Sequence, residues 1–172
     1  MWRIRVFFSR IKNVLRWLPV IWRDRDWDDY YIWEILKFKL KNQAKYIGDR
    51  DRHTRAKHDA KVMNLCVRLI DKIEEEYYGM EYMDYADNLF SSKPSETHPG
   101  YFELDIEEKS ERYDEYFKKY PRIYKKVVEA EWMPFNRDSK AGIAMNIAHI
   151  NEKRVQTLLF KILDQNIRGW WD

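Results

Sequence analysis

The chain contains 172 residues, of which 45% are hydrophobic, and its formal net charge is +3. This length suits one ordinary hydrophobic core and is short for two. Only 5 glycines and 5 prolines are present, so the chain lacks the regular turn signals of an all-β protein, and a helical fold is predicted. The single cysteine, Cys66, excludes an internal disulfide and favours a reducing cytoplasm.

Residues 1–18 carry apolar side chains at intervals of three and four positions. This spacing predicts a basic amphipathic N-terminal helix, which Pro19 is expected to end. Arg10, Lys12 and Arg16 interrupt the apolar residues, so no segment here is expected to cross a membrane.

A helical hairpin is predicted over residues 26–78. Its first helix begins near Asp26, a favourable N-cap residue, and Gly48 is well placed to end it. Its second helix runs from about Thr54 to Tyr78. The wide apolar face of this second helix predicts a central position in the fold.

Residues 79–102 break the helical pattern with two glycines and two prolines, and they predict a long loop, with or without a helical turn, that could form a lid or a contact surface. The C-terminal helices are expected within residues 103–172: a charged helix from Leu104 to about Tyr120, a shorter helix from Pro121, and a long helix capped by Asp138 or Ser139. The sequence therefore predicts an all-α fold, a single domain of residues 1–172 built as a bundle of about five or six helices.

Antiparallel packing of the predicted hairpin separates its charges into two poles. Residues 41–61, the basic pole, hold seven cations and three aspartates, a net charge of +4. The acidic pole at the other end comprises Asp26, Asp28, Asp29, Glu34, Asp71, Glu74, Glu75 and Glu76. Residues 1–23 contain six cations and no acid, so we predict that the N-terminal helix packs against the acidic pole. Peripheral binding to an anionic membrane and contact with nucleic acid are the alternatives.

The basic pole is the candidate ligand site. Arg55 and Lys57 fall in the predicted first turn of a helix, where the helix dipole disfavours cations, so a bound anion is the expected compensation. The assigned roles are phosphate binding for Arg50, Arg52 and Arg55, further hydrogen bonds for His53 and His58, and stacking on a base for Tyr46. The alternative is a solvated turn that its own aspartates partly neutralise.

The sequence contains no recognisable catalytic, cofactor or metal motif. His53 and His58 are separated by about 140° around a helix, so they would not share a face as metal ligands. We therefore assign no catalytic residue, no cofactor and no metal, and we expect a non-catalytic activity. Trp170 and Trp171 are interpreted mainly as aromatic residues that close the core.

Three segments resemble uncharacterised small α-helical accessory proteins of tailed bacteriophages. They are RWLPVIWRDRDWDDYYIWEILKFKLKNQAKYI (16–47), AKVMNLCVRLIDKIEEEYY (60–78) and LLFKILDQNIRGWWD (158–172). The resemblance carries no assigned functional residues. It implies the cytoplasm of a bacterial host and an accessory role outside the virion, and it places a membrane surface behind the other partners.

Phage accessory proteins of this size often act by binding a host protein or a signalling nucleotide of host defence. This analogy and the basic pole favour a protein that sequesters an anionic, nucleotide-type host defence signal. Two alternatives remain: a protein-interaction module that inhibits a host protein, and a nucleic-acid-binding factor that uses the N-terminal arginines. A homo-oligomer is expected, because aromatic amphipathic ends favour association.

Overall fold

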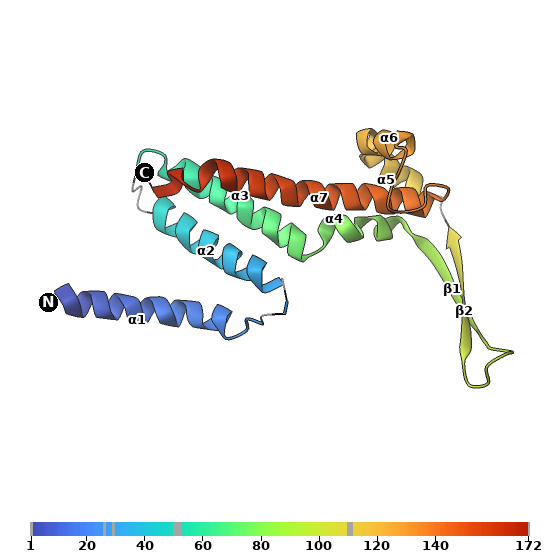
Figure 1. The fold of residues 1–172 in the computed structure, drawn as a ribbon, viewed down its shortest axis with the longest axis horizontal. Coiled ribbons are helices and arrows are strands. Elements are labelled where there is room, and N and C mark those ends of the chain that lie inside the picture. The colour runs from blue at the N-terminus through green and yellow to red at the C-terminus, as the bar shows by residue number, and fades with distance from the viewer. Residues whose placement is uncertain (1, 26, 29, 50–52, 110–111, 172) are drawn as a thin grey trace. The chain divides into compact units, whose positions relative to one another are not determined.

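The computed structural model describes residues 2–25, 27–28, 30–49, 53–109 and 112–171 (Figure 1). It is 73% helical, with seven helices and one two-stranded sheet in the part it describes, which confirms the predicted all-α class. Contacts within the chain group its residues into two compact units, residues 1–74 with 158–172 and residues 75–157. Each unit is described in turn.

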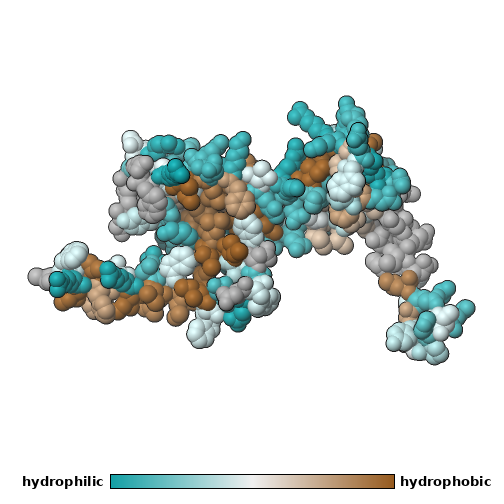
Figure 2. Space-filling view, in the orientation of Figure 1, coloured by the Kyte–Doolittle hydropathy of each residue, from teal (hydrophilic) through white to brown (hydrophobic). Residues whose placement is uncertain are grey.

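The first unit contains α1 (Trp2–Ile21), α2 (Tyr30–Gly48), α3 (Ala56–Glu74), the end of α7 (Lys140–Asn166) and the 3-10 helix η2 (Gly169–Trp171). The amphipathic helix α1 has no buried residue, and apolar side chains follow its length in Figure 2. It continues through Pro19 to Ile21, so the prediction that Pro19 ends this helix is wrong. The backbone N–H of Trp22 still donates to the carbonyl of Leu18 at 2.8 Å.

Helices α2 and α3 pack antiparallel in the centre of this unit. Where α2 ends, a Cβ atom on Gly48 would lie 3.1 Å from the Cβ of Ala60 in α3, so the two helices approach closely here. At the start of α2, the backbone N–H of Tyr30 donates to Oδ1 of Asp28 at 3.0 Å. The predicted cap, Asp26, lies outside the described residues. The core includes Leu40, Ala44, Ile47, Met63, Cys66, Val67, Ile70, Leu159, Leu163 and Trp170.

The second unit contains α4 (Tyr77–Met80), the 3-10 helix η1 (Glu81–Tyr85), β1 (Asp87–Pro94), β2 (Phe102–Lys109), α5 (Tyr113–Lys119), α6 (Pro121–Glu129) and the first part of α7. Two predictions are corrected here. Residues 79–102 are not one long loop, because they hold part of α4, η1 and β1. The helix expected from Leu104 is the strand β2, and α5 begins only at Tyr113.

The strands β1 and β2 form an antiparallel hairpin in which Asp87 pairs with Lys109 and Pro94 with Phe102. The segment FELDIEEK (102–109) alternates apolar and charged residues, which is the pattern of a strand. In the turn, the N–H of Ser95 donates to the carbonyl of Tyr101 at 2.8 Å. Gly100 has a φ of 91°, a conformation that favours glycine. Hydrogen bonds in the turn therefore add to the pairing of the two strands in stabilising the β-hairpin.

The core of the second unit is rich in aromatic rings. It consists of Tyr113, Tyr116, Phe117, Ile123, Val127, Ala144 and Ile147. Beside it, the buried carboxylate of Glu81 accepts hydrogen bonds from the hydroxyl of Tyr120, at 2.6 Å, and from the ammonium group of Lys119. Burial, together with the hydrogen bond to Glu81, raises the pKa of the Tyr120 hydroxyl. This residue therefore acts as a donor that holds η1 against α5.

The start of α7 is fixed to the preceding segment by polar contacts. Ser139 caps the helix, as predicted, because its Oγ accepts from the N–H of Gly142 at 3.1 Å. Asn146 is fully buried and bonds both backbone groups of Phe135, accepting from the N–H at 3.2 Å and donating to the carbonyl at 3.0 Å. The side-chain amide thereby holds an irregular segment in place.

Candidate functional site

The residues predicted to bind an anion lie around the end of α2 and the start of α3. Tyr46 belongs to the last turn of α2, and 50% of its surface is exposed. His53 and Arg55 precede α3, and His58 is exposed in its first turn. Two of the predicted residues lie outside the described part of the chain: Arg50 and Arg52.

The carboxylate of Asp59 occupies the turn that these residues form. Asp59 is only 1% exposed. Its Oδ1 lies 3.7 Å from Nη2 of Arg55, and its Oδ2 lies 3.8 Å from Nε2 of His53. A carboxylate in the first turn of a helix is favoured by the helix dipole, so the turn has an internal counter-charge. Binding of an external anion by this turn stays a prediction.

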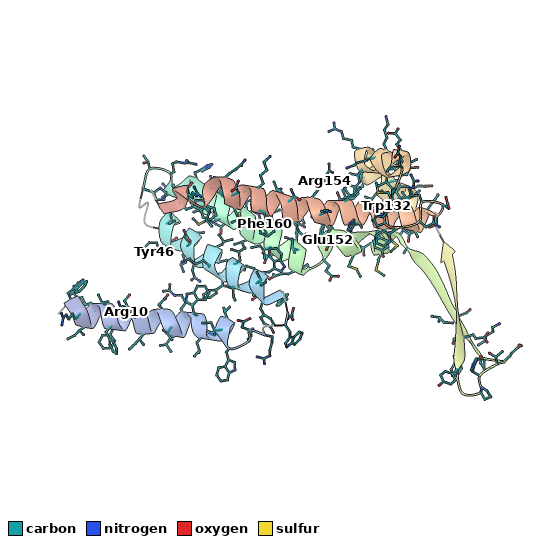
Figure 3. All side chains as sticks on the ribbon, viewed as in Figure 1. Arg10, Tyr46, Trp132, Glu152, Arg154 and Phe160 are labelled. Atoms are coloured by element: carbon teal, nitrogen blue, oxygen red, sulfur yellow. The ribbon has the colours of Figure 1, made fainter. Side chains whose placement is uncertain are left out.

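Tyr46 also lines a cavity that the sequence did not indicate. The cavity lies between α1 and α2 and has a volume of about 300 Å³. Figure 3 labels Tyr46 on α2. The lining residues are Asn13, Arg16, Trp17, Lys39, Asn42, Gln43 and Tyr46. Only one of the predicted site residues, Tyr46, is among them.

The lining of this cavity combines positive charge with aromatic rings and amides. Arg16 and Lys39 supply two cations, and the lining includes no carboxylate. Trp17 and Tyr46 supply rings on which a flat group could stack. A neighbouring cavity of about 430 Å³ differs because its lining includes Glu34. Of these two cavities between α1 and α2, the first is therefore the better suited to an anion.

Gln43 contributes a polar group that the protein itself does not satisfy. The residue is 7% exposed, and its amide nitrogen Nε2 is buried without a hydrogen-bond partner. Leaving such a donor unpaired costs free energy, and native proteins seldom do so. Gln43 lines the cavity, so a ligand that accepts a hydrogen bond there would remove this cost.

Helix α1 rests on α2 through an aromatic contact beside the cavity. The rings of Trp17 and Phe38 have centroids 4.8 Å apart and meet edge to face, an arrangement that aromatic pairs prefer. Asn42, next to this pair, donates from its amide nitrogen to the carbonyl of Phe38 at 2.8 Å. These contacts position Trp17 and Asn42 as two adjoining walls of the site.

Lys37 of α2 pairs with three carboxylates of the acidic pole. The ammonium group of Lys37 contacts the carboxylates of Glu34 and Glu74, and it lies 3.6 Å from Oδ1 of Asp71. Burial lowers the pKa of Lys37, but its hydrogen bonds to Glu34 and Glu74 outweigh this effect and raise it. Among the described residues, no carboxylate forms an ion pair with the cations of residues 2–23. Arg23 and Glu34 do line one cavity between the end of α1 and the start of α2, so packing of α1 against the acidic pole stays a prediction.

Replacing Lys37 by methionine is expected to lower the free energy of unfolding by roughly 2–3 kcal/mol, because it leaves the side chain of Glu74, only 7% exposed, without its cation. The change is measured by urea denaturation at neutral pH. Lys41→Met is the matched control, since Lys41 is 53% exposed and its Nζ lies 4.0 Å from Asp71. The control is expected to cost less than about 1 kcal/mol. Equal losses of stability in the two variants would show that the ion pair between Lys37 and Glu74 contributes no more than an exposed one.

Other reactive groups do not assemble into a site within the described residues. These contain no cluster of three or more histidine, cysteine, aspartate or glutamate side chains that could hold a metal ion. Cys66 is buried, and burial raises the pKa of its thiol to about 11. His149 is exposed and makes an edge contact with the ring of Phe135. The cavity between α1 and α2 therefore remains the candidate site.

Sequence reasoning missed six of the cavity residues: Asn13, Arg16, Trp17, Lys39, Asn42 and Gln43. One signal could have indicated part of this set. Asn13 falls opposite the apolar stripe of the N-terminal helix, and Trp17 lies outside the stripe beside one of its edges, so this face carries a ring and an amide that the stripe does not use. The amides of α2 carry no such signal, because isolated asparagine and glutamine residues are common on exposed helix surfaces.

The chain matches no protein-family model, no curated protein and no solved structure.

Proposed function

We propose that this chain is a non-catalytic binding protein that holds a small anionic ligand with an aromatic ring, of the nucleotide kind, between α1 and α2. The observation that carries the proposal is the cavity lining, which combines two cations, two rings and an unpaired buried amide. Its volume of about 300 Å³ is at the lower end of the range for ligand pockets, which suits a mononucleotide.

Each part of a nucleotide has a partner in this cavity. The guanidinium group of Arg16 can bind two phosphate oxygens at once, and Lys39 adds a second positive charge. The base can stack on Trp17 or Tyr46, an interaction that tolerates every base because each has a π-face. The amide nitrogen of Gln43 can donate to an acceptor on the base edge or the sugar.

The finer proposal concerns the biological ligand. The resemblance to phage accessory proteins and the anion-binding character of the cavity support sequestration of a nucleotide-type signal of host defence. The first measurement is isothermal titration calorimetry with a panel of linear and cyclic mononucleotides, cyclic dinucleotides and inorganic phosphate. Saturable binding of a mononucleotide, with much weaker binding of phosphate, is expected because the rings contribute to affinity.

Replacing Arg16 by alanine is expected to lower nucleotide affinity by about 10- to 100-fold, because a charged hydrogen-bonding partner of the phosphate is lost. Calorimetry with the tightest nucleotide of the panel provides the measurement. Arg10→Ala is the control, since it removes the same charge from α1 at a residue outside the cavity lining (Figure 3). It should change the affinity by less than about twofold.

Gln43→Leu provides an independent check on the site. Leucine has a similar size and no unpaired donor, so this variant should fold at least as stably as the parent chain while binding the nucleotide more weakly. Flat titrations across the whole panel, or equal effects of Arg16→Ala and Arg10→Ala, would contradict the proposed function.

A further inference from the structure

The apolar stripe of α1 is an exposed surface of the first unit that the proposed ligand site does not use. Its members are between 39% and 78% exposed: Ile4, Phe7, Phe8, Ile11, Val14, Leu15, Leu18, Ile21 and Trp22. Figure 2 shows hydrophobic residues along the lower edge of α1. A continuous exposed apolar patch of this kind marks an interaction surface, since monomeric proteins seldom expose one.

The stripe faces away from the helix that supports α1. A helix turns by about 100° per residue, which places Asn13 about 160° and Trp17 about 120° around the axis from Ile11. Asn13 and Trp17 line the cavity against α2, and Trp17 contacts Phe38 of α2. The apolar stripe, on the other side of α1, is therefore left uncovered by α2.

Cations border the stripe on both sides. By the same rotation, Arg5 and Lys12 lie along one flank, and Arg3 and Arg10 lie along the other. Residues 2–23 contain six cations and no acid. Long basic side chains beside an apolar face can keep their charged ends in a polar layer while their stems cover apolar surface. This arrangement complements a partner that has an apolar interior and a negatively charged surface.

Trp22 lies at one end of the stripe, whereas Trp2 lies on the opposite side of α1 by the same rotation. Trp2 is 75% exposed and Trp22 is 78% exposed. Tryptophan prefers the boundary between water and lipid, because its ring is apolar and its N–H is a donor. No helix in the described part of the chain is long and apolar enough to span a bilayer. The same features do suit a helix that lies parallel to the surface.

We propose that α1 binds anionic lipid bilayers by lying in the interface, with its apolar stripe inserted and its flanking cations at the headgroups. A second copy of the chain fits this surface less well, because two α1 helices packed stripe to stripe would bring their cations together. Nucleic acid would engage the cations without covering the stripe. The proposal departs from the expectation that a membrane surface ranks behind other partners, because that expectation did not include an exposed stripe.

The test is co-sedimentation of the full chain with vesicles of phosphatidylcholine containing phosphatidylglycerol, compared with vesicles of phosphatidylcholine alone. The parent chain is expected to sediment with the anionic vesicles and to bind neutral ones at least about tenfold more weakly. The double variant Phe7→Glu with Leu15→Glu should lose binding to anionic vesicles by more than about tenfold, because it places charges in the inserted face. Tryptophan emission should shift to shorter wavelength only when vesicles bind.

The control is the double variant Ile32→Glu with Trp132→Glu, which makes the same charge change at exposed apolar residues outside α1. It should retain vesicle binding to within about threefold. An equal loss in the control, or no preference for anionic vesicles, would overturn the proposal. A third outcome would also overturn it: the parent chain stays in the supernatant, and sedimentation velocity shows a dimer that the stripe variant converts to monomers. A second copy of the chain would then occupy the stripe.

Vesicle and nucleotide binding are separable in this design. The stripe variants leave the cavity lining unchanged, so they should bind nucleotide as the parent chain does. Gln43→Leu should in turn retain vesicle binding. Failure of one experiment therefore leaves the other proposal standing.

Discussion

Replacing Trp170 by alanine is expected to lower the free energy of unfolding by about 3–5 kcal/mol, the largest loss among the variants considered. Trp170 is 2% exposed and lies in η2, at the end of the first unit. Removing its ring leaves a cavity that the surrounding helices can fill only in part. The loss is measured by urea denaturation followed by circular dichroism, because tryptophan fluorescence changes with the substitution itself.

Two further variants define the origin of this loss. The indole N–H of Trp170 is buried without a partner, so phenylalanine should be tolerated better than alanine, with a loss of less than about 2 kcal/mol. Trp132→Ala is the control, because Trp132 is 77% exposed, and it should change stability by less than about 0.5 kcal/mol. A Trp170→Ala variant as stable as this control would show that η2 does not belong to the folded core.

Gly142→Ala is expected to destabilise the protein by about 3 kcal/mol or more, although alanine is the better helix former. A Cβ atom at this position would lie 1.7 Å from the carbonyl oxygen of Asn136 and 2.8 Å from its carbonyl carbon. Both are backbone atoms, so no side-chain rotation relieves the clash. The segment must move, and its two hydrogen bonds between Phe135 and Asn146 are then strained or lost.

Gly169→Ala is the matched control, since a Cβ atom there meets nothing within 4 Å. It should change the free energy of unfolding by less than about 0.5 kcal/mol. Thermal and urea denaturation of the two variants provide the comparison. A Gly142→Ala variant of unchanged or raised stability would mean that residues 134–139 do not pack on α7 as described.

Periodicity predicted the helices whose apolar faces are buried. In α3, Met63, Val67 and Ile70 recur at helical spacing, and all three are buried in the structure. The same periodicity predicted the stripe of α1 but not its surroundings. Spacing identifies an apolar face and carries no information about what covers it.

The β1–β2 hairpin was not predicted, because the high charge of residues 102–109 was given more weight than their alternating pattern. Residues 102–109 have many acids, which suggested an exposed helix, yet Phe102, Leu104 and Ile106 alternate with charged residues as in a strand. The pairing of β1 with β2 depends on contacts between residues up to 22 positions apart, as in Asp87 with Lys109. Local propensity is a weak guide to such pairing.

The candidate site was predicted only in part, for a physical reason. Tyr46 was identified from the charged turn beside it, but Arg16 and Gln43 reach the cavity only because α1 packs on α2. Lys37 within the α2–α3 hairpin already pairs with Glu34 and Glu74, so the charge of the acidic pole alone does not determine where α1 packs. Whether a carboxylate of α2 or α3 pairs with a lysine of the same two helices depends on how each helix is rotated about its axis. Composition does not reveal this rotation.

The two-stranded sheet has no inner strand, so each of its strands has one side with backbone groups that no other strand of the described chain pairs. Such edges can template the addition of a further strand and so start aggregation. The composition of β2 opposes this, because its eight residues contain four carboxylates and one lysine. Two β2 edges brought together would align like charges, and Pro94 at the end of β1 offers no N–H to an incoming strand. The acidic composition of β2 is therefore expected to disfavour edge-to-edge pairing of the hairpin with a second chain.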